Sequence, residues 1–243
     1  MDRALWITWY NLPDQGCDAY LSWLHGTYIP ELLKRPGYLW AAHYAKLNAT
    51  NVSRASRKKL TTSDPTVPKG DQYILLLGAE CTSVFGNPGP AALHAGMPPA
   101  SREMLAMRME ERVNIMTEAA RVNGPEAKRY PDGMVLAPCI QLGTFNCDPK
   151  DEEDMLVWFS KWRLPAMTSL SGCVRTRKLA SVVGWAKHAI LYEFASLEAR
   201  NHFLATHEDA PAEREWTDRV VLSLTHAPGS ANVGCRIWPP ASA

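Results

Sequence analysis

One stretch decides the fold: Trp23-Leu24-His25-Gly26-Thr27-Tyr28-Ile29-Pro30-Glu31-Leu32-Leu33-Lys34-Arg35-Pro36-Gly37. It does so because a degenerate copy of it occurs later in the chain. A shift of 135 positions matches the two copies without a gap, as Trp23/Trp158, Pro30/Pro165, Gly37/Gly172, Leu21/Leu156, Leu32/Met167 and Asn11/Asn146. A proline bends a helix, and a glycine lets the chain turn out of it. The matched residues therefore indicate a tandem duplication of one structural unit.

The composition bounds the class of protein. The chain has 243 residues, of which 46% are hydrophobic and 21% charged, as in ordinary globular proteins. A net charge of +1 does not suggest a nucleic-acid partner. Residues 1–6 lack the pattern of a signal peptide, and no stretch approaches the ~20 apolar residues of a membrane span. The six cysteines include no C-x-x-C pair, so we expect free thiols in a cytoplasmic protein without a membrane partner.

The first copy shows alternating strand and helix patterns: strand 4–11, helix 18–35, strand 38–47, a long basic loop 48–71, strand 72–77, a glycine- and proline-rich insertion 80–100 and a short helix near 101–110. Residues 112–121 could continue that helix, because Val113, Met116 and Ala120 share one side. Alignment of 111–113 with 218–220, which open a strand-like run, favours a fourth strand in both copies.

The second copy repeats this order after a linker at 124–133: strand 134–146, helix 151–170, strand 173–179, strand 189–194, helix 197–207 and strand 219–226. Asp148-Pro149 is typical of a helix start, with an acidic N-cap before a proline. Asn11 and Asn146 are expected to cap the turns after the first strands. Each copy thus has the ferredoxin-like order β-α-β-β-α-β. The predicted domains are 1–123 and 134–243.

A unit of this order whose first helix carries Trp23, then Pro30, then Pro36-Gly37 before a strand resembles the dimeric α+β barrel superfamily, especially its EthD-like and antibiotic-biosynthesis-monooxygenase-like branches. The resemblance covers nearly the whole chain as two fused copies. It implies an α+β fold in which two antiparallel sheets form a barrel with helices outside and a pocket between helix and sheet. The halves of such a barrel normally come from the two chains of a homodimer. Here one chain would supply both halves, and a further homodimer of this chain is an alternative that the sequence does not decide.

The resembled family often has a histidine two residues before the helix proline. Tyr28 occupies that position in the first copy and Arg163 in the second, so the histidine is not carried over. His25 lies one turn before Tyr28 on the arc predicted to face the sheet. We predict that His25 is the acid/base and that Tyr28 orients the substrate. The alternative is a half-buried pair that bonds to backbone.

Five further residues are candidate substrate-binding groups. His43 and Tyr44 lie on opposite faces of the second strand, so only one of them can face the helices. Arg163 on its buried arc needs a partner, either an acidic substrate group or a structural carboxylate. Arg175 and Arg177 share one face of the matching strand and could bind an anion.

No metal-binding spacing of histidines occurs, and no cofactor is expected. Haem stays open, because some tandem barrels of the resembled superfamily carry it and a single axial histidine leaves no motif. The sequence predicts a cofactor-independent enzyme of the cyclase, isomerase, lyase or monooxygenase type that acts on an aromatic or hydrophobic, acidic small molecule. A non-catalytic ligand-binding barrel and a haem-binding barrel are the alternatives.

Overall fold

The computed structural model describes residues 1–47, 60–130, 137–206 and 214–240. The first repeat contains β1 (Ala4–Asn11), α1 (Cys17–Trp23), η1 (Leu24–Tyr28), α2 (Ile29–Leu33), β2 (Tyr38–Lys46), β3 (Leu60–Thr61), β4 (Tyr73–Ala79), η2 (Thr82–Gly86), α3 (Pro90–Ala95), α4 (Pro99–Leu105) and β5 (Met109–Asn123). Residues 48–59 of the predicted loop 48–71 lie outside the described residues, and the described part contains β3. The expected fourth strand is present as β5, whereas the expected insertion contains α3.

The short helix η3 (Pro125–Arg129) follows, within the predicted linker. The second repeat contains β6 (Cys139–Cys147), α5 (Glu152–Trp158), η4 (Phe159–Arg163), α6 (Leu164–Ser169), β7 (Cys173–Val183), β8 (His188–Phe194), α7 (Leu197–Thr206), α8 (Arg214–Leu222), β9 (Leu224–His226) and β10 (Asn232–Trp238). Within the described part of the chain, no helix is long and apolar enough to cross a membrane.

The first helices of the two repeats have the same internal construction. In each, an α-helix passes through one π-helical turn, η1 or η4, and continues as a second α-helical segment with its proline near the start. Pro30 and Pro165 have no N–H, and each ring crowds the carbonyl four residues earlier, so a wider turn relieves the conflict. These segments begin at positions related by the shift of 135, which confirms the duplication and the predicted bend.

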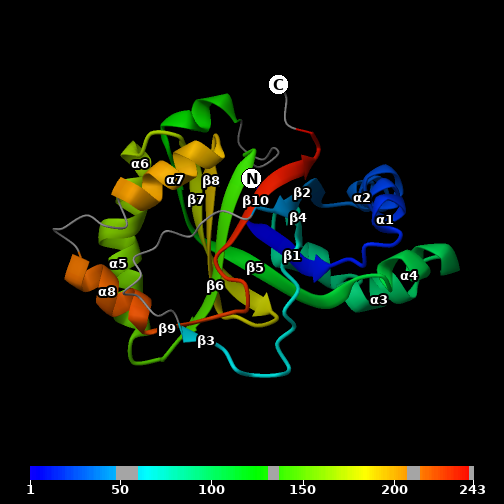
Figure 1. The fold of residues 1–243 in the computed structure, drawn as a ribbon, viewed down its shortest axis with the longest axis horizontal. Coiled ribbons are helices and arrows are strands. Elements are labelled where there is room, and N and C mark those ends of the chain that lie inside the picture. The colour runs from blue at the N-terminus through cyan, green and yellow to red at the C-terminus, as the bar shows by residue number, and fades with distance from the viewer. Residues whose placement is uncertain (48–59, 131–136, 207–213, 241–243) are drawn as a thin grey trace.

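The strands form one closed antiparallel barrel (Figure 1). The first repeat has the order β5-β1-β4-β2, and the second has β7-β8-β6 followed by β9 and β10, which both pair with β6. Two antiparallel pairings close the barrel between the repeats, β5 with β7 and β10 with β2. The short strand β3 also pairs with β9 of the second repeat, in parallel. The helices of each repeat lie outside the strands, on opposite sides of the barrel (Figure 1). This arrangement confirms the predicted α+β barrel of two ferredoxin-like units.

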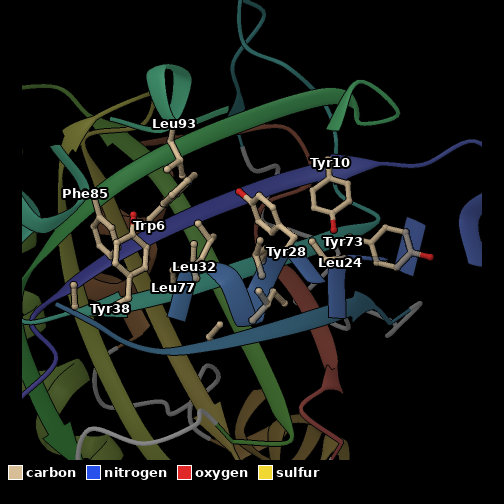
Figure 2. Packing of buried hydrophobic residues seen from close by; sticks show 14 of the residues in the cluster. Trp6, Tyr10, Leu24, Tyr28, Leu32, Tyr38, Tyr73, Leu77, Phe85 and Leu93 are labelled. Atoms are coloured by element: carbon tan, nitrogen blue, oxygen red, sulfur yellow. The ribbon is translucent and has the colours of Figure 1, made fainter. Parts of the chain in front are cut away.

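Three apolar layers hold the molecule together. The interior cluster of the barrel draws on both repeats, with Leu5, Ile7, Trp9, Trp40, Tyr44, Ile74, Leu76, Ile140, Leu142, Leu179 and Leu191 among its members. A second layer packs the first repeat's helices on the outer face of its sheet, where Trp6, Tyr28 and Leu32 meet (Figure 2). The third layer repeats this packing in the second half around Trp158 and Phe194. Both faces of each sheet are therefore covered.

Three expectations for local structure were wrong. Residues 219–226 do not form one strand, because α8 extends to Leu222 and the fourth strand is divided between β9 and β10. The Trp158 indole donates to the Thr217 hydroxyl, and this packing holds the apolar run of α8 as a helix against α5. The second wrong expectation is that Asp148-Pro149 starts the helix of the second repeat. That helix begins after Asp151, and the carboxylate of Asp148 instead accepts from the backbone of Lys150 in a turn.

The third wrong expectation concerns the paired asparagines. Asn11 accepts hydrogen bonds from the backbone N–H groups of Asp71 and Gln72, and Asn146 accepts one from that of Lys187. These N–H groups immediately precede β4 and β8. Both asparagines therefore tie the end of the first strand to the start of the third, instead of capping the turn that follows.

Gly172 gives a test of the duplicated turn. Its φ is 79°, and an added Cβ would overlap the side chain of Ala199. A side chain in this backbone region costs about 1–2 kcal/mol before any clash, so we expect Gly172→Ala to lower the free energy of unfolding by at least that amount. The matched control is Gly26→Ala in the π-helical turn, where an added Cβ would meet no atom of the described residues within 4 Å outside the backbone of its own helix. Urea unfolding of both variants checks this, and equal midpoints would contradict it.

Candidate functional site

A cleft of about 520 Å³ opens in the first repeat between the first helix and the α3–α4 segment. Apolar side chains form much of its wall, among them Leu32, Leu93 and Met97. Tyr28 lines it from η1, and Glu31 and Arg35 line it from α2 and its C-terminal end. The volume falls within the range of about 300–1,000 Å³ that is common for small-molecule sites.

Tyr28 forms a hydrogen bond with a histidine that the sequence analysis did not select. Its hydroxyl lies 2.7 Å from Nε2 of His94 on α3. Burial raises the pKa of Tyr28 well above its usual value, although Arg108 opposes the shift. Burial, assisted by Arg108, lowers the pKa of His94 to about 4. The tyrosine thus keeps its proton and the imidazole is neutral, so we assign Tyr28 as the donor and Nε2 as the acceptor.

Arg108, next to this pair, places a buried positive charge in the helix–sheet layer. Its guanidinium lies 4.7 Å from the ring centroid of Tyr10 and 5.5 Å from that of Tyr28. Nε donates to the Tyr20 hydroxyl at 2.6 Å, and Nη1 pairs with Glu111 at 2.7 Å. Because water is largely excluded from this layer, the charge acts strongly on nearby groups.

His25 belongs to a different chain of hydrogen bonds. Its Nε2 lies 2.9 Å from Nδ1 of His43, whose Nε2 lies 2.8 Å from the Tyr10 hydroxyl. The His43 ring also stacks on Tyr73, with centroids 5.3 Å apart. Burial lowers the pKa of both histidines, and that of His43 falls well below its usual value. Both rings are therefore neutral near pH 7. The structure does not bring His25 and Tyr28 together, since each contacts a different histidine.

The strand parity that the sequence left open is resolved by these contacts. His43 faces the helices, whereas Tyr44 points into the barrel and donates to the backbone oxygen of Ala137 at 2.8 Å. His94 had no signal in the sequence, because its partner Tyr28 lies 66 positions away and no histidine spacing links the two.

Arg175 and Arg177 face the barrel interior, on the same side of β7 as Leu179. Nη1 of Arg177 lies 2.7 Å from the carboxylate of Asp2, and its Nε lies 3.3 Å from Glu193. Burial alone would raise the pKa of Asp2, but Arg177 and Arg121 lower it below its usual value. The anions beside Arg177 are thus carboxylates of the protein. These two arginines lie on the other face of the sheet from the helix–sheet layer.

Arg163 is buried in the outer layer of the second repeat. Its guanidinium lies 4.9 Å from the ring centroid of Trp158 and 5.2 Å from that of Phe203. Aromatic faces attract cations, so these rings offset part of the cost of burying the charge. A substrate-binding role for Arg163 stays a prediction.

The second repeat places different chemistry at the equivalent positions. The shift of 135 matches Lys178 to His43, Phe145 to Tyr10 and Glu152 to Cys17. His188 faces Phe145 across the sheet in the register in which Tyr73 faces Tyr10. Lys178 Nζ lies 3.2 Å from Nδ1 of His188, whose Nε2 lies 3.0 Å from Glu152. A smaller cleft of about 290 Å³ opens beside these residues.

Neither cleft presents a described histidine with a ring nitrogen free to bind a haem iron. No histidine lines the larger cleft. His188 lines the smaller one, but Lys178 and Glu152 occupy both of its ring nitrogens. Across residues 1–47, 60–130, 137–206 and 214–240, no group of three or more His, Cys, Asp or Glu side chains is arranged to hold a metal ion.

The buried histidines predict a dependence of stability on pH. His25, His43 and His94 have lowered pKa values in the folded chain, so the unfolded chain binds their protons at higher pH. Stability should fall as pH drops from about 6.5 toward 4, by up to about 1.4 kcal/mol per pH unit for each proton. We expect His94→Gln to reduce this slope and the exposed control His202→Gln to leave it unchanged. Urea midpoints measured between pH 4.5 and 7 that do not change would contradict this.

Comparisons with known proteins find similarity in three-dimensional structure only. No protein-family model matches the chain, and no curated protein matches its sequence. A candidate monooxygenase from Fusobacterium nucleatum superposes with a TM-score of 0.57 at 8% identity, over 97% of this chain and 91% of that one. One from Lactobacillus acidophilus gives 0.54 at 11% identity, over 98% and 94%.

A dye-decolorizing protein from V. cholerae gives a TM-score of 0.53 at 11% identity, over 97% of this chain and 94% of that one. At such low identity the likeness shows the fold, and activity does not follow from it. The chain therefore shares the fold of these structures, a dimeric α+β barrel-like fold in which one tandem-duplicated polypeptide supplies both halves of the barrel.

Proposed function

We propose that this protein is a small-molecule enzyme that works without an organic cofactor and removes a proton from an aromatic or other hydrophobic acid bound in the 520 Å³ cleft of the first repeat. The observation that carries the proposal is the Tyr28 hydroxyl, which belongs to a residue of the cleft wall and bonds at 2.7 Å to a neutral His94. A neutral imidazole that accepts from the hydroxyl of a cleft-lining tyrosine gives a proton taken from a substrate a place to go, which general base catalysis needs.

The walls of the cleft support a hydrophobic substrate of modest size. Leu32, Leu93 and Met97 offer apolar contact, while Arg35 offers a positive charge that Glu31 partly offsets. An aromatic ring or short polycyclic system bearing one acidic group matches these walls. The charge on Arg108 behind the wall would stabilise the anion that forms when the bound substrate loses its proton.

The proposed step moves one proton in two concerted transfers. The Tyr28 oxygen takes a proton from an acidic C–H or O–H of the substrate, while its own proton passes to Nε2 of His94. The substrate is left as an enolate or phenolate, and the imidazole becomes imidazolium. The substrate anion beside the imidazolium offsets the positive charge of Arg108, which raises the pKa of His94 and makes it a stronger base than in the free protein.

An anion of this kind is the shared starting point for several reactions. It can be protonated at another carbon, lose a leaving group, close a ring or react with dioxygen. The isomerase, lyase, cyclase and monooxygenase types are therefore all compatible with the proposed step. In this proposal His25 is not the base, because it does not line the cleft and its Nε2 is bonded to His43. The His25–His43–Tyr10 chain instead supports the wall behind the cleft.

Deuterium exchange tests the proton transfer without knowledge of the full reaction. Aromatic 1,3-dicarbonyl compounds and anthrone-type polycyclic phenols are incubated with the protein in D₂O, and NMR follows loss of the acidic C–H signal. We expect catalysed exchange with at least one compound that raises the melting temperature. Tyr28→Phe should retain that thermal shift and slow exchange about 10²–10⁴-fold, which is the usual contribution of a general acid or base.

His25→Gln is the matched control, since it alters a nearby buried histidine chain without touching the cleft. It should exchange at the rate of the unmodified protein. Full exchange activity in Tyr28→Phe would sink the proposal. Binding without any catalysed exchange would favour a ligand-binding barrel instead.

A further inference from the structure

We propose that the second repeat holds a separate reactive site in which the amine of Lys178 forms an imine with small, apolar aldehydes or ketones that enter the 290 Å³ cleft. This site is in the other half of the barrel from Tyr28 and does not depend on the function proposed above. It is argued from the position of the amine, the groups that contact it and the cleft beside it.

Lys178 reaches its position from β7 and is only 6% exposed, yet it lines the cleft. Its Nζ contacts neutral acceptors, Nδ1 of His188 at 3.2 Å and the backbone oxygen of Leu179 at 3.3 Å. It also lies 5.4 Å and 5.3 Å from the ring centroids of Phe145 and Phe159. Among the described residues no carboxylate forms an ion pair with this amine. The two rings attract the charged form, but burial without a carboxylate partner outweighs them and favours the uncharged amine, which is the nucleophilic form.

The charged groups around Lys178 agree with this. Burial lowers the pKa of Lys178 to about 7, and Lys187 adds to the shift, while Glu152 and Cys147 oppose it. Glu153 also lines the cleft but is not among the groups that shift this amine. About half of the Lys178 amines are thus uncharged near pH 7. An ordinary lysine with a pKa near 10.4 has roughly a thousandfold less of the reactive form at that pH.

His188 and Glu152 supply the proton transfers that imine formation needs. As Nζ attacks the carbonyl carbon, Nδ1 of His188 can accept the proton that the nitrogen loses. The imidazolium returns this proton to the former carbonyl oxygen, which becomes the hydroxyl of the tetrahedral intermediate. The second proton of the nitrogen then follows the same route to that hydroxyl, which leaves as water, so amine and carbonyl give imine and water without an oxidant. Glu152, 3.0 Å from Nε2, stabilises the transient imidazolium.

In the first repeat, the position that matches Lys178 is fully occupied by side-chain hydrogen bonds. There His43 replaces Lys178, and His25 and Tyr10 occupy both of its nitrogens. In the second repeat the matching residues are Ser160, whose hydroxyl bonds to the backbone of Leu156, and Phe145, which has no hydrogen-bonding group. Among the side chains that the structure describes, Lys178 therefore lacks the second partner that His43 has, and it lines a cleft whose wall includes Ala119, Met155, Leu156 and Ala180, which favours apolar carbonyl compounds over charged ones.

Reductive trapping tests this site in the full chain. The protein is incubated with benzaldehyde and sodium cyanoborohydride between pH 6 and 10, and peptide mass spectrometry gives the extent of labelling at each lysine. We expect Lys178 to be labelled at least tenfold faster than any other lysine at pH 7, with a midpoint near pH 7 in its rate. Labelling spread over exposed lysines while Lys178 stays unmodified, or a midpoint near 10 at Lys178, would overturn the proposal.

Variants separate the chemistry from simple accessibility. His188→Gln should slow trapping at Lys178 about tenfold or more and leave exposed lysines unaffected, whereas the exposed control Lys161→Gln should change nothing at Lys178. Tyr28→Phe should trap at the normal rate, which keeps this result independent of the first cleft. Lys178→Met should abolish the fast label. If that variant does not fold, the pH midpoint at Lys178 in the unmodified protein decides the matter.

Discussion

Closure of the barrel by two pairings between the repeats, β5 with β7 and β10 with β2, is the constraint on which the rest of the structure depends. It buries an apolar interior to which both halves contribute, including Trp9 and Trp40 from one repeat and Ile140 and Leu191 from the other. Because this interior covers one face of each sheet, the other face can hold polar side chains beneath helices, where little water reaches them. The shifted pKa values of His43 and Lys178 both follow from that burial.

The two outer layers show how a duplicated unit can diverge in chemistry while the backbone keeps its register. In the first repeat, Cys17, Tyr73 and His43 form a chain that His25 and Tyr10 complete. At the matching positions of the second repeat, Glu152, His188 and Lys178 form a chain that ends at an open cleft. In the first repeat these positions are fully hydrogen-bonded and have a structural role, whereas in the second repeat they place the Lys178 amine beside a cleft. The larger cleft of the first repeat lies elsewhere, between helices, and uses Tyr28 and the added His94.

Much of this architecture could be predicted from a few residues whose backbone requirements are strict. Pro30 and Pro165 predicted the bent helices, and Gly37 and Gly172 predicted the turns after them. In the structure both glycines have the positive φ values that such turns require. The predictions failed where packing decides between two locally acceptable structures. The run Val220–Leu222 fits a strand or a helix equally well, and contacts with α5 select the helix. The pair of Tyr28 and His94 could not be predicted either, because it joins the first helix to α3 across 66 positions of sequence and no residue spacing links the two.

The most direct test of the shared interior is to express residues 1–130 and 137–243 as separate chains. Each half alone would expose its face of the interior cluster and two unpaired strand edges, so we predict that neither folds alone and that the mixture forms a 1:1 complex. Circular dichroism and analytical ultracentrifugation read both outcomes. A half that folds cooperatively as a monomer, with a melting temperature close to that of the whole chain, would contradict the account.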